Sequence, residues 1–91
     1  MKKQIAILGS TGSIGTQALE VIAEHPDLFE VYCLTANNKV EELARQARQF
    51  RPAAVIIANE EKYDHLKDLL SDMPDIKVYA GSKAIDDIVE A

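Results

Sequence analysis

The sequence has few of the residues that disulfide-stabilised, membrane-spanning or nucleic-acid-binding proteins need. It contains one cysteine, Cys33, and no tryptophan among 91 residues, so no disulfide can form within the chain and nothing indicates secretion. No stretch approaches the roughly 20 apolar residues of a membrane span. Lys and Arg number 10 against 15 Asp and Glu, which gives a formal net charge of −5. This balance argues against nucleic acid or an anionic membrane as the main partner, and we expect a cytoplasmic protein.

The residues that are present describe one α/β domain with a thin core. The chain is 47% hydrophobic and 27% charged, which is ordinary for a globular domain of small size. Short apolar runs alternate four times with segments of helical periodicity, and this alternation predicts parallel strands joined by right-handed crossovers. The expected strands are 5–8, Phe29–Ala36, 53–58 and 76–80, and the expected helices are 13–25, Val40–Phe50, 60–70 and a last one after residue 82.

A glycine-rich loop lies between the first strand, which we expect to be covered on both faces, and the first helix. Gly9 lets the chain leave the strand sharply, Gly12 lets the backbone approach a phosphate, and Gly15 lets the helix pack close to the strand. The helix N-terminus adds unpaired amides and the positive end of a dipole. The loop therefore predicts a pyrophosphate site, although an ordinary tight turn has the same glycines. Three hydroxyl residues add donors: Ser10, Thr11 and Ser13.

The tip of the second strand has no carboxylate. In dinucleotide-binding folds an Asp or Glu at this place accepts hydrogen bonds from the ribose 2′-hydroxyl of NAD. Here Asn37, Asn38 and Lys39 follow the strand, and the first carboxylate is Glu41. Two carboxamides and an ammonium suit a 2′-phosphate, which favours NADP over NAD. The alternative is a polar loop in which the two asparagines supply turn chemistry and cap the next helix.

Other candidate residues have ordinary structural interpretations. We expect Cys33 to be a small buried apolar residue and His25, at a helix end, to interact with the helix dipole rather than to act in catalysis. Asp64 and His65 are neighbours on a helix and point apart, so we expect both, like Lys62, to be solvated surface residues.

The seven residues Gly9-Ser10-Thr11-Gly12-Ser13-Ile14-Gly15 resemble the N-terminal signature of the 1-deoxy-D-xylulose 5-phosphate reductoisomerase family. The resemblance extends over nearly the whole chain. Further matching positions are Leu19, Val21, Pro26, Phe29, Val31, Leu34, Ala36, Val40, Leu43, Gln46, Phe50 and Pro52.

The resemblance implies an NADPH-dependent oxidoreductase of non-mevalonate isoprenoid biosynthesis. Such an enzyme rearranges and reduces 1-deoxy-D-xylulose 5-phosphate to 2-C-methyl-D-erythritol 4-phosphate, with Mg or Mn held by carboxylates. Many relatives have asparagine where this chain has Lys39, so whether Asn38 or Lys39 meets the 2′-phosphate stays open. The residues implied to contact the phosphates and neighbouring atoms are Thr11, Gly12, Ser13 and Ile14, and those around the 2′-phosphate are Asn37, Asn38 and Lys39.

The resemblance also sets expectations about domain organisation. We expect residues 1–91 to be the N-terminal part of an NADP-binding, Rossmann-like three-layer domain, comprising about one half of that fold plus one further βα unit. The metal, substrate and C-terminal domains would lie outside this chain, so we assign no catalytic or metal-binding residue within it and expect it to be inactive alone. A homodimer acting on a small phosphorylated sugar is implied for the whole protein.

The usual strand order of a dinucleotide fold, 3-2-1-4, would leave strand 76–80 at an open edge, and we then expect a marginal fold. Two other functions fit the residues: a nucleotide-sensing regulatory module without chemistry, and another NADP-dependent reductase with a similar loop.

Overall fold

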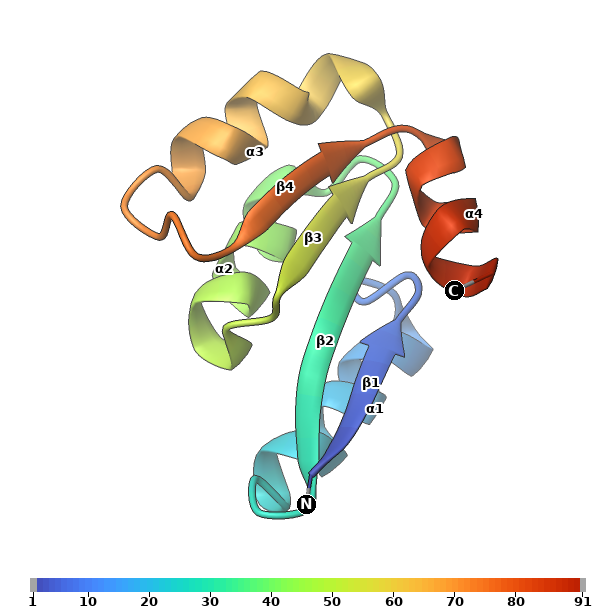
Figure 1. Ribbon diagram of the computed structural model, residues 1–91, viewed down its shortest axis with the longest axis vertical. Helices are drawn as coiled ribbons and strands as arrows, with labels where there is room; N and C mark the ends of the chain where they lie inside the picture. The colour runs from blue at the N-terminus through green and yellow to red at the C-terminus, as the bar shows by residue number, and fades with distance from the viewer. Residues whose placement is uncertain (1, 91) are drawn as a thin grey trace.

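The computed structural model describes residues 2–90 and confirms the alternation of strands and helices (Figure 1). The first half of the chain contains β1 (Lys3–Ile7), α1 (Ser13–Glu24), β2 (Phe29–Ala36) and α2 (Val40–Phe50). The second half contains β3 (Ala54–Ile57), a 3₁₀ turn η1 (Glu60–Lys62), α3 (Tyr63–Leu69), β4 (Lys77–Ala80) and α4 (Ser82–Glu90).

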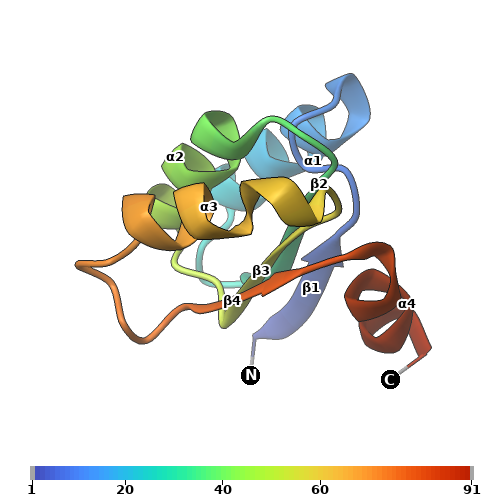
Figure 2. The same ribbon diagram turned by 90° about the horizontal axis from the view of Figure 1, so that it is seen from above.

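The strands form one parallel sheet in the order β1-β2-β3-β4. The expected order 3-2-1-4 is therefore wrong, because β4 pairs with β3 and not with β1. The reason lies in the helices: α1, α2 and α3 lie on the same side of the sheet (Figure 2). Right-handed crossovers that keep their helices on one face move along the sheet in one direction. As a result β1 and β4 are the two edges of the described sheet, β4 as expected but beside a different neighbour.

Helices cover both faces of the sheet, which confirms a partial Rossmann-like α/β fold in three layers. The main core lies between the sheet and α1–α3 and includes the fully buried Leu34, Leu43 and Leu66. On the other face, α4 packs against a smaller cluster made by Cys33, Ala54 and Ile56, and it stands apart from the other helices in Figure 2. Cys33 is fully buried, as expected.

Strand β1 is more exposed than we expected. Ile7 is buried, whereas Gln4 and Ala6 are exposed and Leu8, just past the strand, is 52% exposed. The expectation of cover on both faces is therefore wrong for β1 in this structure. The physical reason is that β1 pairs with a single strand and that α4 packs against β2 and β3. Between residues 2 and 90, no helix is long and apolar enough to cross a membrane.

Candidate functional site

The turn from β1 to α1 is built on two glycines that the backbone requires. Gly9 has φ +71°, in the left-handed region that favours glycine, and its carbonyl accepts a hydrogen bond of 3.0 Å from the amide of Gly12. A Cβ on Gly15 would lie 2.3 Å from the carbonyl oxygen of Gly9 and 2.7 Å from Cα of Ser10. The expected roles of Gly9 in the sharp exit and of Gly15 in close packing are confirmed.

Gly12 differs from the other two glycines, because nothing within the fold requires it. Its φ of −82° and ψ of 174° are open to any residue. A Cβ there would meet its nearest neighbour, the carbonyl oxygen of Gly9, at 3.4 Å, an ordinary contact. Gly12 is the N-cap of α1, a position that serine or aspartate fills at least as well. Glycine at this position is therefore compatible with the close approach of a ligand to the backbone, and the geometry of the turn does not require it.

The N-terminus of α1 is open to an anion. Gly12 makes no side-chain capping bond, and the first turn contains no acidic residue. The first amides of a helix have no acceptor within the helix and carry the positive end of its dipole. Gly12 and Ser13 are exposed, Thr11 is half-buried, and Ile14 is 84% exposed despite its apolar side chain. The four residues predicted to meet the cofactor phosphates thus lie together at one accessible helix end.

Ser10 is not a ligand donor, so this expectation is wrong. Its side chain is fully buried, and its hydroxyl donates to Oε1 of Gln46 at 2.6 Å. The carboxamide Nε2 of Gln46 donates back to the carbonyl of Ser10 at 2.8 Å. Gln46 was missed by sequence reasoning, although a signal was there: it lies three residues after Leu43 and one before Ala47, on the face of α2 that is buried. A buried amide must find partners.

The end of β2 holds the glycine turn in place. The amide of Gly9 donates to Oγ1 of Thr35 at 2.9 Å, and the amide of Ser10 donates to the Thr35 carbonyl at 2.8 Å. These bonds join the loop after β1 to the end of the neighbouring parallel strand. Both parts of the predicted site therefore lie at the carboxyl edge of the sheet, where open α/β folds bind ligands.

Asn37, Asn38 and Lys39 form an exposed turn between β2 and α2. Lys39 is the N-cap residue of α2 and makes no side-chain capping bond, so the alternative in which the asparagines cap α2 is wrong on that point. Oδ1 of Asn38 instead accepts a hydrogen bond of 2.8 Å from Nδ2 of Asn59. Oδ1 of Asn59 in turn accepts from the amide of Glu61 at 3.0 Å, as expected of a cap. These hydrogen bonds connect the turn to η1. The side chain of Lys39 is exposed at the surface and takes no part in them.

A groove of about 740 Å³ lies beside this turn, between α2 and the start of α3. Lys62 and His65 belong to its wall, although sequence reasoning placed both on the solvated surface. The guanidinium of Arg45 is bonded to the carboxylate of Glu42 at 2.7 Å, so Lys39 and Lys62 supply the remaining positive charge. The lining residues are Asn38, Lys39, Val40, Glu41, Glu42, Arg45, Lys62 and His65.

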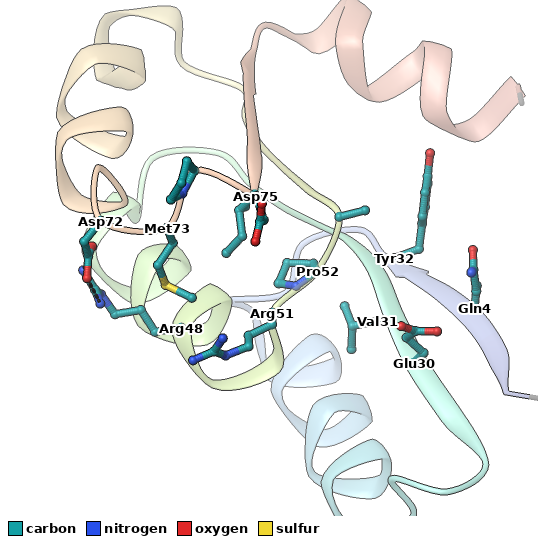
Figure 3. A pocket seen from close by; sticks show the side chains of 13 residues that line it. Gln4, Glu30, Val31, Tyr32, Arg48, Arg51, Pro52, Asp72, Met73 and Asp75 are labelled. Atoms are coloured by element: carbon teal, nitrogen blue, oxygen red, sulfur yellow. Dashed lines mark hydrogen bonds and ion pairs between the residues drawn. The ribbon is translucent and has the colours of Figure 1, made fainter.

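A second hollow, of about 540 Å³, lies at the opposite edge of the sheet (Figure 3). Residues just before the strands or in the first half of them line it, together with Arg48 and Asp72. Arg48 donates to the carboxylate of Asp72 and, at 2.9 Å, to the carbonyl of Leu69. The hydrogen bond from Arg48 lowers the pKa of Asp72 below its ordinary value. Because this hollow is at the amino ends of the strands, it is not a part of the candidate site.

No group of three or more His, Cys, Asp or Glu side chains is placed to hold a metal ion in the part of the chain that the structure describes.

The parallel sheet, the helices on both faces and the glycine turn define a partial Rossmann-like α/β fold. Residues 5–91 match the sequence profile of the 1-deoxy-D-xylulose 5-phosphate reductoisomerase family, and the chain belongs to that family.

Two relatives show the extent of the similarity. The 1-deoxy-D-xylulose 5-phosphate reductoisomerase of Phocaeicola vulgatus is 71% identical over 91 residues, all of this chain and 24% of the relative. That of Porphyromonas gingivalis is 60% identical over 91 residues, again all of this chain and 23% of the relative. The chain thus spans about a quarter of the length of the curated relatives it matches.

Two solved structures share the fold at comparable coverage. The reductoisomerase from Zymomonas mobilis in complex with NADPH has a TM-score of 0.88 and 33% identity, over 92% of this chain and 22% of that one. A DOX-P reductoisomerase in complex with NADPH, fosmidomycin and magnesium has a TM-score of 0.84 and 30% identity, over 90% of this chain and 20% of that one.

Proposed function

We propose that this chain is the N-terminal part of the NADPH-binding domain of a reductoisomerase that converts 1-deoxy-D-xylulose 5-phosphate to 2-C-methyl-D-erythritol 4-phosphate. The observation that carries the proposal is the N-terminus of α1, which has no side-chain cap. Its N-cap residue is Gly12, and the backbone angles and surroundings of Gly12 do not require a glycine. Membership of the family supports it, as do the related structures in complex with NADPH. A sensing module or a different reductase explains the loop equally well but not the family match.

The pyrophosphate of the cofactor would lie at the first turn of α1. Backbone amides there supply hydrogen bonds, and the hydroxyls of Thr11 and Ser13 lie on the same exposed rim. With no acidic side chain in the first turn, no fixed charge repels the anion. The exposed side chain of Ile14 offers an apolar surface to neighbouring atoms of the cofactor. NADPH supplies the hydride when it is bound, and these residues hold its phosphates.

The 2′-phosphate would lie in the groove beside Asn37, Asn38 and Lys39. Lys39 is exposed and makes no side-chain capping bond, and Lys62 lines the same groove from the start of α3, so two ammonium groups line one groove. An anion there gains charge-assisted hydrogen bonds, and NADH, without the 2′-phosphate, gains none. Asn38 already accepts from Asn59, which leaves its own amide group to donate.

We further propose that Mg or Mn and the phosphorylated sugar are bound by residues outside 1–91, in a cytoplasmic homodimer. The described residues offer no cluster that would hold a divalent ion. The related structures in complex with magnesium and fosmidomycin, each several times longer than this chain, support the part of the proposal that concerns the metal and the substrate.

Gly12→Leu in the complete protein tests the assignment of the loop. The leucine would fill the space above the α1 amides, and the KM for NADPH should rise more than about tenfold, which corresponds to about 1.4 kcal/mol. Gln17→Leu is the matched control, because Gln17 is exposed on α1 one helical turn beyond the loop. Unchanged cofactor kinetics in Gly12→Leu would refute the site, and equal use of NADH and NADPH by the unaltered protein would refute the 2′-phosphate pocket.

A further inference from the structure

Gln46 is a buried polar residue in an otherwise apolar face of α2. It is 7% exposed, and its neighbours Leu43 and Ala47 on the same face are fully buried. Burying a carboxamide costs free energy unless both of its polar ends are bonded. Here one residue satisfies both: Oε1 accepts from the Ser10 hydroxyl at 2.6 Å and Nε2 donates to the Ser10 carbonyl at 2.8 Å. An apolar side chain at this position would fill the core without any such cost.

The two bonds of Gln46 are half of a larger clamp on the glycine turn. Thr35 accepts from the amide of Gly9 through Oγ1 at 2.9 Å and from the amide of Ser10 through its carbonyl at 2.8 Å. Two consecutive loop residues are thus held from two elements, α2 and the end of β2, that lie 25 or more residues away in sequence. No buried side-chain polar atom in the described part of the chain lacks a partner.

We propose that Gln46 is a positioning residue for dinucleotide binding, which it serves by fixing Ser10 and thereby the amides at the start of α1. The inference rests on the proposed function of the loop. Gly9 and Gly12 make this turn intrinsically flexible, and ordering a flexible loop when a ligand binds reduces affinity. Gln46 does not line the exposed rim at Gly12 and Ser13. It acts through Ser10, which is buried behind that rim.

Gln46→Glu in the complete protein separates positioning from simple packing. Glutamate has the shape of glutamine, but an ionised carboxylate accepts from the Ser10 hydroxyl and cannot donate to the Ser10 carbonyl. Burial raises the pKa of a carboxyl group, so protonation restores the missing donor at mildly acid pH. Relative to the unaltered protein at the same pH, NADPH should bind about tenfold or more weakly at about pH 8 and recover at about pH 5.5.

Gln49→Glu is the matched control. It places the same charge on the same helix, one turn further along, at an exposed position. Glu20 of α1 and Glu42 and Arg45 of α2 line the groove beside Gln46. These three side chains are present in the unaltered protein and in both variants, so their effect on NADPH binding cancels when the proteins are compared at the same pH. The Gln49→Glu protein should follow the unaltered protein at every pH. In Gln46→Glu, kcat at saturating NADPH should stay unchanged while KM for NADPH rises, whereas loss of folded protein would lower kcat alone.

Thr35→Val provides a second arm if Gln46→Glu does not fold, because it removes the acceptor for the Gly9 amide without altering α2. A rise in KM for NADPH in that variant supports the clamp. If the unaltered protein binds NADPH and Gln46→Glu, or in its place Thr35→Val, binds within about twofold at both pH values, the inference is wrong and the proposed function stands. If the unaltered protein binds no NADPH, the proposed function fails and the inference fails with it.

Discussion

Gly15→Ala tests the close approach of α1 to the glycine turn. The added methyl carbon would lie 2.3 Å from the carbonyl oxygen of Gly9, 2.7 Å from Cα of Ser10 and 3.0 Å from the carbonyl carbon of Gly9. The shortest of these distances is about 1 Å inside ordinary van der Waals contact. All three atoms belong to the backbone, so no side chain can rotate away, and either the helix or the turn must move.

The magnitude follows from two opposing effects. Alanine in place of glycine in a helix favours folding by about 1 kcal/mol. Overpacking costs about 1–3 kcal/mol where side chains can adjust, and the rigid backbone on both sides of this contact places the cost at about 3 kcal/mol or more. The net loss in the free energy of unfolding is about 2 kcal/mol or more. For a domain of this size that corresponds to a melting temperature lower by about 8–16 °C.

Thermal unfolding followed by circular dichroism measures the effect on the 91-residue chain. Gly12→Ala is the matched control, because its methyl group would meet its nearest atom at 3.4 Å, an ordinary contact. It should lower the free energy of unfolding only by the loss of a glycine N-cap, a few tenths of a kcal/mol to about 1 kcal/mol, which corresponds to a melting temperature lower by no more than about 8 °C. A Gly15→Ala protein that melts within about 2 °C of the unaltered chain would refute the close approach. A Gly12→Ala protein that melts as low as Gly15→Ala would refute the distinction between the two glycines.

Two further predictions concern charge. Burial raises the pKa of the Cys33 thiol from 9.0 to about 11, so the folded state retains a proton that the unfolded state releases between these values. The free energy of unfolding should therefore fall by about 1.9 kcal/mol as pH rises from about 9 to about 11, which is most of the roughly 2.7 kcal/mol that the whole shift of about 2 pH units represents. Urea unfolding at about pH 9 and about pH 11 measures this decrease, and Cys33→Ala should lack the part that the thiol contributes. If the free energy of unfolding falls equally with pH in both proteins, the prediction is wrong. Lys62→Glu in the complete protein should raise KM for NADPH about tenfold without raising KM for NADH, because it reverses a charge in the groove beside Lys39. Lys67→Glu, on α3 outside that groove, should leave the preference for NADPH intact, and a similar loss in both variants would count against the pocket.

Local structure was predictable where the sequence contains clear boundaries. The bounds of β2 and α2 agree with the structure residue by residue, because turn-forming residues stand before α2 and Pro52 follows it closely. The predicted ends of β3 and β4 lie within about one residue of the observed ends, and the predicted start of α3 lies about three residues too early. There the chain forms the 3₁₀ turn η1 before α3 begins.

Long-range arrangement was less predictable. Strand order depends on which face of the sheet each crossover helix covers, and an amphipathic helix such as α3 fits either face. Leu66 and Leu70 decide the matter by joining the core that α1 and α2 share, a fact that periodicity alone does not contain. The alternating exposure of β4, with Lys77 and Tyr79 exposed, is typical of an edge strand and agrees with its observed place.

In the candidate site too, the residue types could be predicted from the sequence, but the directions of their side chains could not. Ser10, Thr11 and Ser13 are equivalent hydroxyl donors in the sequence, yet the positive φ of Gly9 is followed by a fully buried Ser10. The hydroxyl of Ser10 therefore serves Gln46 and not a ligand. Which hydroxyl faces inward is decided by the turn, and the turn depends on contacts with α2 and β2 that are distant in sequence.

Each of the three glycines of the loop therefore has a different explanation. Gly9 is required by its left-handed φ and Gly15 by the backbone atoms 2.3 and 2.7 Å from its missing Cβ. Both would be needed in a tight turn that binds nothing, so neither distinguishes a phosphate site from the ordinary turn that the sequence also allows. Gly12 has no such requirement, and its position at the uncapped end of α1 makes it the glycine that separates the two interpretations. Its replacement by leucine therefore tests function with the least disturbance to the fold.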